Sequence, residues 1–230
     1  MTGHPKPETG FNATFCVSSQ KRTSPTDSLE SLVYPENSFP LKRPIHQLDS
    51  SSRVIFLDRD GVINQERAGA YIRTPEEWVP IPGSLEAIAR LCEAGHEIII
   101  LTNQSGLGRG LLTLDDLEAI HTKLVQTVED HGGHIAGIYF CPHTPTEDCS
   151  CRKPKDGLIR LAESELGCRA KNAPFIGDQL TDVKAARSAE CRPFLVRTGR
   201  GKEIFDEELS DVEIHSDLSS AADAILGETQ

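Results

Sequence analysis

Residues 54–61 read Val-Ile-Phe-Leu-Asp-Arg-Asp-Gly, an apolar run followed at once by two aspartates and a glycine. A short apolar run that stops at turn-forming residues is typical of a buried strand. Four further apolar runs follow along the chain, and amphipathic segments separate them. Five such strands alternating with helices predict an α/β fold, a Rossmann-like parallel sheet flanked by helices on both faces.

The segment after the second run shows the clearest helical period, because its apolar residues recur every three or four positions. Thr113 and Asp116 resemble a capping box at its start, and Gly132-Gly133 ends it. Its apolar face holds Leu114, Leu117, Ile120, Leu124 and Val128. The expected strands are residues 54–57, 97–101, 138–140, 174–176 and 193–196, the expected helices are 84–93, 113–130, 158–166 and 182–188, and an edge strand and closing helix are expected within 211–230.

Composition excludes several classes of protein. Hydrophobic residues make up 37% of the chain and the mean hydropathy is −0.34, and no apolar run approaches the roughly 18 residues of a membrane span. No basic and apolar secretory leader is visible, so we expect a cytoplasmic protein with no membrane partner. The net charge of −11 argues against binding to nucleic acid. An anionic small substrate remains compatible, because a metal or a basic pair can outweigh the global charge locally.

Residues 1–52 differ from the rest of the chain. They hold six of the fourteen prolines, nine serines and a balanced set of charges, without a helical or strand period. We expect a disordered extension, since such a segment buries too little apolar surface to offset its ordering entropy; a mis-called start codon would look the same. Residues 53–230 are expected to form the folded domain.

The residues that follow the strands carry the chemistry, because ligands of such sheets bind at the carboxyl ends of the strands. Asp58 could attack an electrophile while Asp60 serves as acid and then base. Asp178, after the fourth strand, would complete a hard-oxygen Mg²⁺ site with Asp58. Thr102 and Lys153 would stabilise the oxygens of a transferring phosphoryl group. Each residue alone has an ordinary structural explanation, but their order, one after each strand, favours phosphoryl transfer.

This pattern resembles the haloacid dehalogenase (HAD) superfamily of phosphatases over residues 53–200. Asp58-Arg-Asp60-Gly is similar to its first motif, Thr102 to its second, Lys153 to its third and Gly177-Asp178 with Asp182 to its fourth. The resemblance implies that Asp58 is the nucleophile and that Asp60 protonates the leaving group and then activates water. It also implies Mg²⁺ on the carboxylates of Asp58 and Asp178 and on the backbone carbonyl of Asp60.

The spacing between the motifs limits which insertions the domain can contain. The intervals from Asp58 to Thr102 and from Thr102 to Lys153 are consumed by the expected loops, helices and strands. Neither has room for the separate cap domain of many superfamily members, so we expect a capless domain in which loops shape the pocket.

The second interval contains a cysteine-rich loop. Cys141, His143, Cys149 and Cys151 offer three thiolates and one imidazole within eleven residues, the ligand set of a closed tetrahedral zinc site. The alternative is a group of buried or oxidisable thiols. A full set of protein ligands predicts a structural Zn²⁺ that fixes the loop leading into Lys153. Cys16, Cys92, Cys168 and Cys191 are expected to be ordinary thiols.

The zinc loop, Arg152-Lys153-Pro154 and residues 102–110 together resemble the heptose 1,7-bisphosphate phosphatases within this superfamily. The resemblance implies hydrolysis of the C7 phosphate of a small-molecule sugar bisphosphate, in the synthesis of activated heptose for lipopolysaccharide. We expect the chain to be a monomer. Histidinol-phosphate phosphatase is the first alternative, against which Ser105 and Arg109 argue. A catalytically silent zinc-binding interaction module is a distant alternative.

The remaining candidate residues are expected to touch the substrate, and two of them lie in the loop that follows the first motif. These substrate-binding candidates are Glu66, Tyr71, Asn103, Gln104, Ser105, Arg109, Arg152 and Gln179. His121, His131 and His134 have no acidic or thiol partner at ligand spacing, and we expect them to be solvated.

Overall fold

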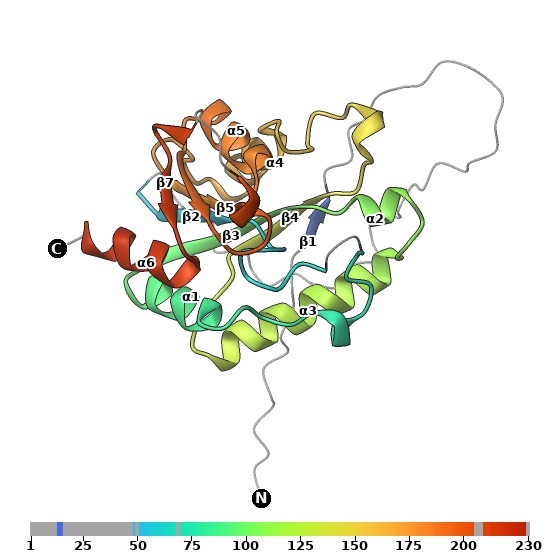
Figure 1. Cartoon of the computed structure of the whole chain (residues 1–230), viewed down its shortest axis with the longest axis horizontal. Coiled ribbons are helices and arrows are strands. Elements are labelled where there is room, and N and C mark those ends of the chain that lie inside the picture. Colours follow the sequence, from blue (N-terminus) through green and yellow to red (C-terminus); the bar gives the residue numbers. More distant parts are fainter. Residues whose placement is uncertain (1–12, 16–47, 49–50, 68–69, 205–208, 229–230) are drawn as a thin grey trace, which may run out of the picture.

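The computed structural model describes residues 13–15, 48, 51–67, 70–204 and 209–228 (Figure 1). The described strands form one sheet in the order β1-β4-β3-β2-β5-β6-β7, and all of its pairings are parallel. Their bounds are β1 (Ala13–Phe15), β2 (Arg53–Leu57), β3 (His96–Asn103), β4 (Gly137–Cys141), β5 (Pro174–Gly177), β6 (Arg192–Val196) and β7 (Glu213–His215). The strand order reverses at β2, which places β3 on one side of it and β5 on the other. The predicted Rossmann-like parallel sheet is confirmed.

Helices cover both faces of this sheet. Their bounds are α1 (Ser84–Glu93), α2 (Ser105–Gly108), α3 (Leu114–Asp130), α4 (Gly157–Leu166), α5 (Leu180–Ser188) and α6 (Leu218–Gly227). Figure 1 shows α1, α3 and α6 together on one face, with α4 and α5 on the other. Three-residue 3₁₀ helices at Pro75–Glu77, Pro145–Glu147 and Gly201–Glu203 lie in the connecting loops.

Two apolar cores follow from the alternation of side chains along each strand. Ile55 and Leu57 of β2 face the core under α1, α3 and α6, whereas Val54 and Phe56 face the core under α4 and α5. All four side chains are buried. The strands therefore bury both faces, as their nearly continuous apolar sequences predict.

The start of α3 has the capping box that the sequence predicts. The Thr113 hydroxyl accepts from the backbone N–H of Asp116, and the Asp116 carboxylate accepts from the backbone N–H of Thr113. The apolar face of α3 is buried, and His121 lies on that face with 1% exposure. The expectation that His121 is solvated is therefore wrong. Its position is four residues after Leu117 and three before Leu124, which places it inside the apolar stripe.

Of the extension expected at residues 1–52, the structure describes Ala13–Phe15, Leu48, Ser51 and Ser52. Ala13–Phe15 pairs with residues 138–140 of β4, so the expectation of no strand in this stretch is wrong at β1. A three-residue strand is too short to show a period, and β4 would otherwise present an unpaired edge. The rest of that prediction lies outside the described residues.

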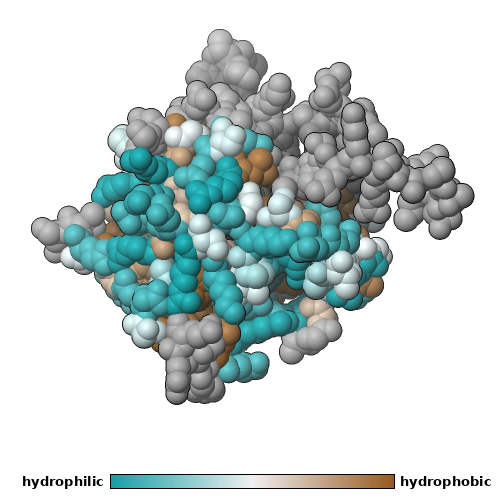
Figure 2. Space-filling view, turned by 90° about the horizontal axis from the view of Figure 1, so that it is seen from above, coloured by the Kyte–Doolittle hydropathy of each residue, from teal (hydrophilic) through white to brown (hydrophobic). Residues whose placement is uncertain are grey.

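The face of the molecule seen in Figure 2 is mainly polar. Figure 2 shows hydrophilic residues over most of the face seen from above, with hydrophobic residues in small separate patches. Among the described helices, none combines the length and the apolar character that crossing a membrane requires.

Candidate active site

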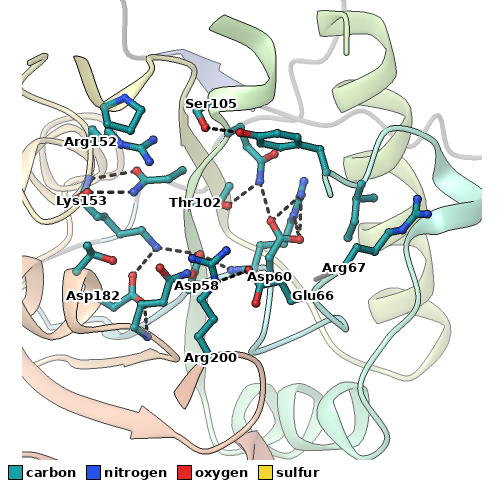
Figure 3. Close-up of a pocket in the computed structure, with 18 of the residues that line it drawn as sticks. Asp58, Asp60, Glu66, Arg67, Thr102, Ser105, Arg152, Lys153, Asp182 and Arg200 are labelled. Atoms are coloured by element: carbon teal, nitrogen blue, oxygen red, sulfur yellow. Dashed lines mark hydrogen bonds and ion pairs between the residues drawn. The ribbon is translucent and has the colours of Figure 1, made fainter. Parts of the chain in front are cut away.

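The carboxyl ends of β2, β3 and β5 open into a cavity of about 360 Å³ (Figure 3). All twelve residues predicted from sequence to act on or touch the substrate line it. They are Asp58, Asp60, Glu66, Tyr71, Thr102, Asn103, Gln104, Ser105, Arg109, Arg152, Lys153 and Gln179. Asp178 lies against the same site as a fully buried residue. Strand ends far apart in sequence are thus brought to one edge of the sheet, as the parallel topology requires.

Lys153 joins two carboxylates at the floor of the cavity. Its Nζ lies 2.8 Å from Asp58 Oδ1 and 2.7 Å from Asp182 Oδ1, and it donates to the carbonyl of Leu101 at 2.8 Å. Figure 3 shows the side chain extended between the two aspartates. The backbone N–H of Arg59 also donates to Asp58 Oδ1, at 2.7 Å. Two donors therefore orient the Asp58 carboxylate.

Burial and mutual repulsion disturb the acidity of these carboxylates. Burial raises the pKa of Asp58 to about 7, with Lys153 opposing the shift and Asp182 adding to it. Burial raises the pKa of Asp178 to about 8, and the charges of Asp58 and Asp182 add to the shift. The pKa of Lys153 is raised despite its burial, because the two carboxylates favour the ammonium. Lys153 thus pairs with two of these carboxylates, and Asp178 adds a third acidic group close to them.

Asp60 lies in a different environment, surrounded by donors. Arg59 Nη2 contacts Asp60 Oδ2 at 2.8 Å, Asn64 Nδ2 donates to Oδ1 at 2.9 Å, and Gln104 Nε2 donates to Oδ2 at 2.9 Å. Burial opposes ionisation of Asp60, but Arg59 and the other donors hold its pKa below the usual value. Gln104 Nε2 also donates to Thr102 Oγ1 at 2.9 Å, which couples the ends of β2 and β3.

The carboxylates of Asp58, Asp178 and Asp182 fit a magnesium ion. Each offers an oxygen within 4.8 Å of the others, and all three residues are buried. Asp178 Oδ1 has no hydrogen-bond partner among the described residues. Buried, closely spaced carboxylate oxygens with unused acceptor capacity are the hard ligands that Mg²⁺ prefers.

Two glycines allow the chain to approach Asp178 closely. A Cβ built on Gly61 or on Gly199 would lie 2.1 Å from Asp178 Oδ2, and both residues have positive φ angles. The backbone N–H of Arg200 donates to the same oxygen at 2.8 Å. The loop after β6 therefore packs its backbone directly onto a candidate metal ligand.

The predicted zinc ligands also come together. Cys141 Sγ lies 3.5 Å from both His143 Nδ1 and Cys149 Sγ, and Cys151 Sγ lies 3.3–3.4 Å from the other three ligand atoms. Zinc bonds of about 2.0–2.3 Å produce tetrahedron edges of similar length. Hydrogen bonds from Cys151 and His143 outweigh burial and lower the pKa of Cys141 to about 5, which favours the thiolate that a metal requires. The four side chains fit a closed Cys₃His site.

This cluster is connected to the cavity through backbone contacts. Arg152 Nη1 donates to the carbonyl of His143 at 3.2 Å. The Asn103 side chain forms two hydrogen bonds with the backbone of Lys153. Its oxygen accepts from the N–H and its nitrogen donates to the carbonyl, both at 3.1 Å. The cysteine loop and the end of β3 therefore position Arg152 and Lys153 together.

The outer part of the cavity contains the residues expected to touch the sugar. Glu66 Oε1 lies 2.7 Å from Arg200 Nε, and the Tyr71 hydroxyl lies 3.2 Å from Ser105 Oγ. Figure 3 shows Ser105 at the end of the cavity away from Asp182. These contacts join polar groups that line the cavity.

Sequence reasoning missed several residues of the site. Arg59, Asp182 and Arg200 line the cavity. Asp182 belonged to the fourth motif, and its spacing from Asp178 on the first turn of α5 could have signalled a role. Arg200 follows β6, so the same rule of strand ends that identified Asp58 could have found it. Of the other histidines, His131 and His134 are both exposed as expected, and His134 Nε2 also lies 2.9 Å from Glu97 Oε2.

Comparison with known proteins assigns the family. A model of the HAD-hydrolase-like family matches residues 150–222. The D-glycero-beta-D-manno-heptose-1,7-bisphosphate 7-phosphatase of Pseudomonas aeruginosa is 44% identical over 177 residues, which cover 76% of this chain and 99% of that protein. The chain belongs to the heptose 1,7-bisphosphate phosphatase family. Membership places it among the phosphoric monoester hydrolases of the HAD superfamily, as the motifs predict.

Solved structures of heptose 1,7-bisphosphate phosphatases share the fold. The enzyme from Bordetella bronchiseptica, complexed with magnesium and phosphate, is 40% identical, with a TM-score of 0.72 over 76% of this chain and 99% of that one. The enzyme from Burkholderia thailandensis is 35% identical, with a TM-score of 0.59 over the same shares of the two chains. The Bordetella structure shows that a member of this family holds magnesium and phosphate.

Proposed function

We propose that this chain is a Mg²⁺-dependent phosphatase that removes the C7 phosphate of D-glycero-D-manno-heptose 1,7-bisphosphate. The observation that carries the proposal is the carboxylate of Asp58, which Lys153 and the Arg59 N–H orient beside Asp178 and Asp182 at the cavity floor. An oriented carboxylate next to a fixed cation suits nucleophilic attack on a phosphate ester. The family relatives carry the name of the same activity.

In the first step, an Asp58 carboxylate oxygen attacks the phosphorus atom, and the bond between phosphorus and the C7 oxygen breaks. Asp60 donates its proton to the departing oxygen. The incoming phosphate dianion favours the protonated form of Asp60, because a nearby negative charge raises the pKa of a carboxyl group. Thr102 Oγ1 and Lys153 Nζ supply a hydroxyl and a cation to the phosphoryl oxygens.

In the second step, water attacks the phosphorus atom of the aspartyl-phosphate, and the Asp58 carboxylate departs. Asp60, now ionised, accepts the proton from this water. The donors from Arg59, Asn64 and Gln104 stabilise this carboxylate form. Inorganic phosphate then leaves, and Asp58 returns to its starting state.

The metal ligands are assigned from the family resemblance, and the clustering of the carboxylates supports the assignment. Asp58 and Asp178 would hold Mg²⁺ with their carboxylates and Asp60 with its backbone carbonyl, and Asp182 lies close enough to orient or join the set. Bound magnesium supplies positive charge that offsets the repulsion between the phosphate and the carboxylates. Zinc on Cys141, His143, Cys149 and Cys151 would be structural, since four protein ligands leave no open position.

The cavity favours a sugar bisphosphate over an amino alcohol phosphate. Its lining includes four arginines at some distance from the nucleophile: Arg67, Arg109, Arg152 and Arg200. Arg67 and Arg200 have acidic neighbours, Glu77 and Glu66, whereas Arg109 and Arg152 have no ion-pair partner among the described residues. A second phosphate would match these two guanidinium groups. Histidinol phosphate carries no second phosphate, so it would leave them without a partner.

The wider biological setting follows from this activity. We propose that the chain acts as a monomer in the cytoplasm, where it would supply heptose 1-phosphate for nucleotide-activated heptose and lipopolysaccharide. The substrate is a small molecule, and neither nucleic acid nor membrane has a part in the reaction.

Rapid quenching tests the mechanism and the site of hydrolysis together. The wild-type chain, mixed with substrate labelled at the C7 phosphate, should form an acid-trapped phosphoprotein with the label on Asp58. Asp58→Asn should form none and should show background turnover while it keeps its fold. Phosphorus NMR of the product should show the C1 phosphate intact. Turnover by Asp58→Asn near the wild-type rate, or loss of the C1 phosphate, would contradict the proposal.

A further inference from the structure

The catalytic aspartate Asp60 is supported from behind by a buried chain of two residues. Arg59 is 1% exposed and fills the space between Asp60 and α3. Its Nε and Nη2 contact Asp60 Oδ1 at 3.2 and 3.1 Å, and Nη2 contacts Oδ2 at 2.8 Å. Its remaining nitrogen, Nη1, lies 3.1 Å from His121 Nε2. Every nitrogen of the guanidinium therefore has a partner.

The direction of the last contact is fixed by chemistry. An arginine guanidinium has donors and no acceptor, so His121 Nε2 must accept from Nη1. The imidazole is then the tautomer with its proton on Nδ1. His121 Nδ1 is buried and has no partner among the described residues. A leucine at this place in the apolar stripe would avoid that unpartnered donor, so the imidazole costs stability at a point where packing alone does not require it.

We propose that His121 is a positioning residue for catalysis, which locks the plane of the Arg59 guanidinium and thereby the orientation of Asp60. Arg59 can rotate about its long side chain unless both ends of the guanidinium are held. Asp60 holds one end and His121 holds the other. Without His121, Nη1 would be a buried donor without a partner, and the guanidinium would turn to find one. The proposal rests on the proposed role of Asp60 as acid and base.

The consequence falls on one part of the reaction. Misorientation of Asp60 impairs proton donation to the leaving oxygen, whereas attack by Asp58 and contacts from Lys153 remain. A poor leaving group needs that proton, and a good leaving group departs without it. The value of kcat/KM reports steps up to phosphoryl transfer to Asp58. Loss of His121 should therefore lower kcat/KM in proportion to the basicity of the leaving group.

The test uses phenyl, 4-nitrophenyl and 2,4-dinitrophenyl phosphate with the full chain and Mg²⁺. His121→Leu should lower kcat/KM for phenyl phosphate by about tenfold or more, a loss of the size that general acid catalysis contributes. The kcat/KM for 2,4-dinitrophenyl phosphate should stay within about threefold of the wild-type value. His121→Gln, whose side-chain oxygen can accept from Arg59, should restore most of the loss. Arg59→Lys, which keeps the charge but not the planar contact, should repeat the pattern of His121→Leu and provides a second route if that variant folds poorly.

Two control variants distinguish a lost positioning role from lost packing and from a wrong assignment of Asp60. Leu124→Ala lies on the same buried face of α3 and removes an apolar side chain that cannot hydrogen-bond to Arg59. It reports the effect of lost packing alone and should lower kcat/KM for all three substrates equally, if at all. Asp60→Asn should show the steepest dependence on the leaving group. If His121→Leu lowers kcat/KM equally for all three substrates, as Leu124→Ala does, or does not lower it at all, the positioning role is overturned. A flat result for Asp60→Asn overturns the assignment of Asp60 itself, whatever the result at His121.

Discussion

The charges around Lys153 support the proposal that this site binds a divalent cation. Asp58 and Asp182 lie within 2.8 Å of its ammonium group, and Asp178 offers a third carboxylate within 4.8 Å of the other two. One cation cannot neutralise three anions in a buried space, so protons bind instead, and the pKa values of Asp58 and Asp178 rise to about 7 and about 8. A metal ion would displace those protons.

This competition predicts a pH-dependent effect of magnesium on stability. Without metal, the folded chain holds protons on Asp58 and Asp178 that the unfolded chain releases near pH 4, so unfolding free energy falls as pH rises toward 8. Magnesium removes this loss because it binds the ionised carboxylates. The rise in Tm on adding Mg²⁺ should be larger at pH 8 than at pH 6. Scanning calorimetry at the two pH values checks this, with Asp178→Asn as the control that should gain little; an equal rise at both would contradict it.

Arg152 should determine substrate preference. Its guanidinium donates to the carbonyl of His143, which orients it, and Arg152 lines the cavity together with Lys153. Loss of one charge-assisted contact costs about 1.5–3 kcal/mol, or roughly one to two decades in kcat/KM. Arg152→Ala should therefore lower kcat/KM by that amount for heptose bisphosphate and much less for 4-nitrophenyl phosphate. Arg152→Lys should recover only part of the lost kcat/KM for heptose bisphosphate, because an ammonium cannot bind a phosphate bidentately. Equal losses on both substrates would place Arg152 in catalysis or stability.

The residues of the site differ in how readily a sequence reveals them. Asp58 and Asp178 directly follow strands and Thr102 lies near the end of β3, so the rule that parallel strands end at one edge was enough to bring them together. His121 lies in the middle of a helix, and nothing in the sequence shows that its neighbour across space is Arg59. Such contacts depend on which helix covers which strand, and local pattern does not contain that information.

The cysteine loop should couple zinc to catalysis. Cys149→Ser should lower the zinc content and the Tm, because metal binding contributes to the folding of the loop. It should also lower kcat/KM, up to about 10²-fold, since Arg152 and Lys153 follow the last ligand and small displacements of catalytic groups are costly. Elemental analysis, calorimetry and steady-state rates measure these effects. Cys92→Ser, which changes a half-buried thiol outside the cluster, should leave all three unchanged. Full activity in zinc-free protein would contradict the coupling.

Elements with strong periods and caps were predicted closely, and short ones were not. The helix expected at residues 84–93 is α1, and Thr113 caps α3 as expected. The strand β1 and the four-residue helix α2 were missed. Both are too short for a repeating apolar pattern to be recognised. Their place in the fold comes from tertiary contacts, with β4 for the strand and with the carbonyl of Pro142 for the helix.

The domain boundary expected near residue 53 leads to a prediction about the chain without its N-terminal segment. Deletion of residues 1–47 removes β1, which lies at the sheet edge and is separated from β2 by β4 and β3. The active site should therefore keep its kcat/KM within about twofold. Loss of a short edge pairing worth about 1 kcal/mol should lower Tm by roughly 2–4 °C. Deletion of residues 1–12 alone keeps β1 and should leave Tm unchanged. A tenfold fall in kcat/KM after the longer deletion would mean that the segment contributes to the site.

Steady-state phosphate release from three substrates, each with Mg²⁺ and with EDTA, tests the proposed activity directly. The substrates are D-glycero-D-manno-heptose 1,7-bisphosphate, histidinol phosphate and 4-nitrophenyl phosphate. The geometry predicts that kcat/KM for the heptose bisphosphate exceeds the other two by roughly one to two decades, since only that substrate offers Arg109 and Arg152 a second phosphate. EDTA should reduce all three rates to background. A preference for histidinol phosphate, or full activity in EDTA, would contradict this account.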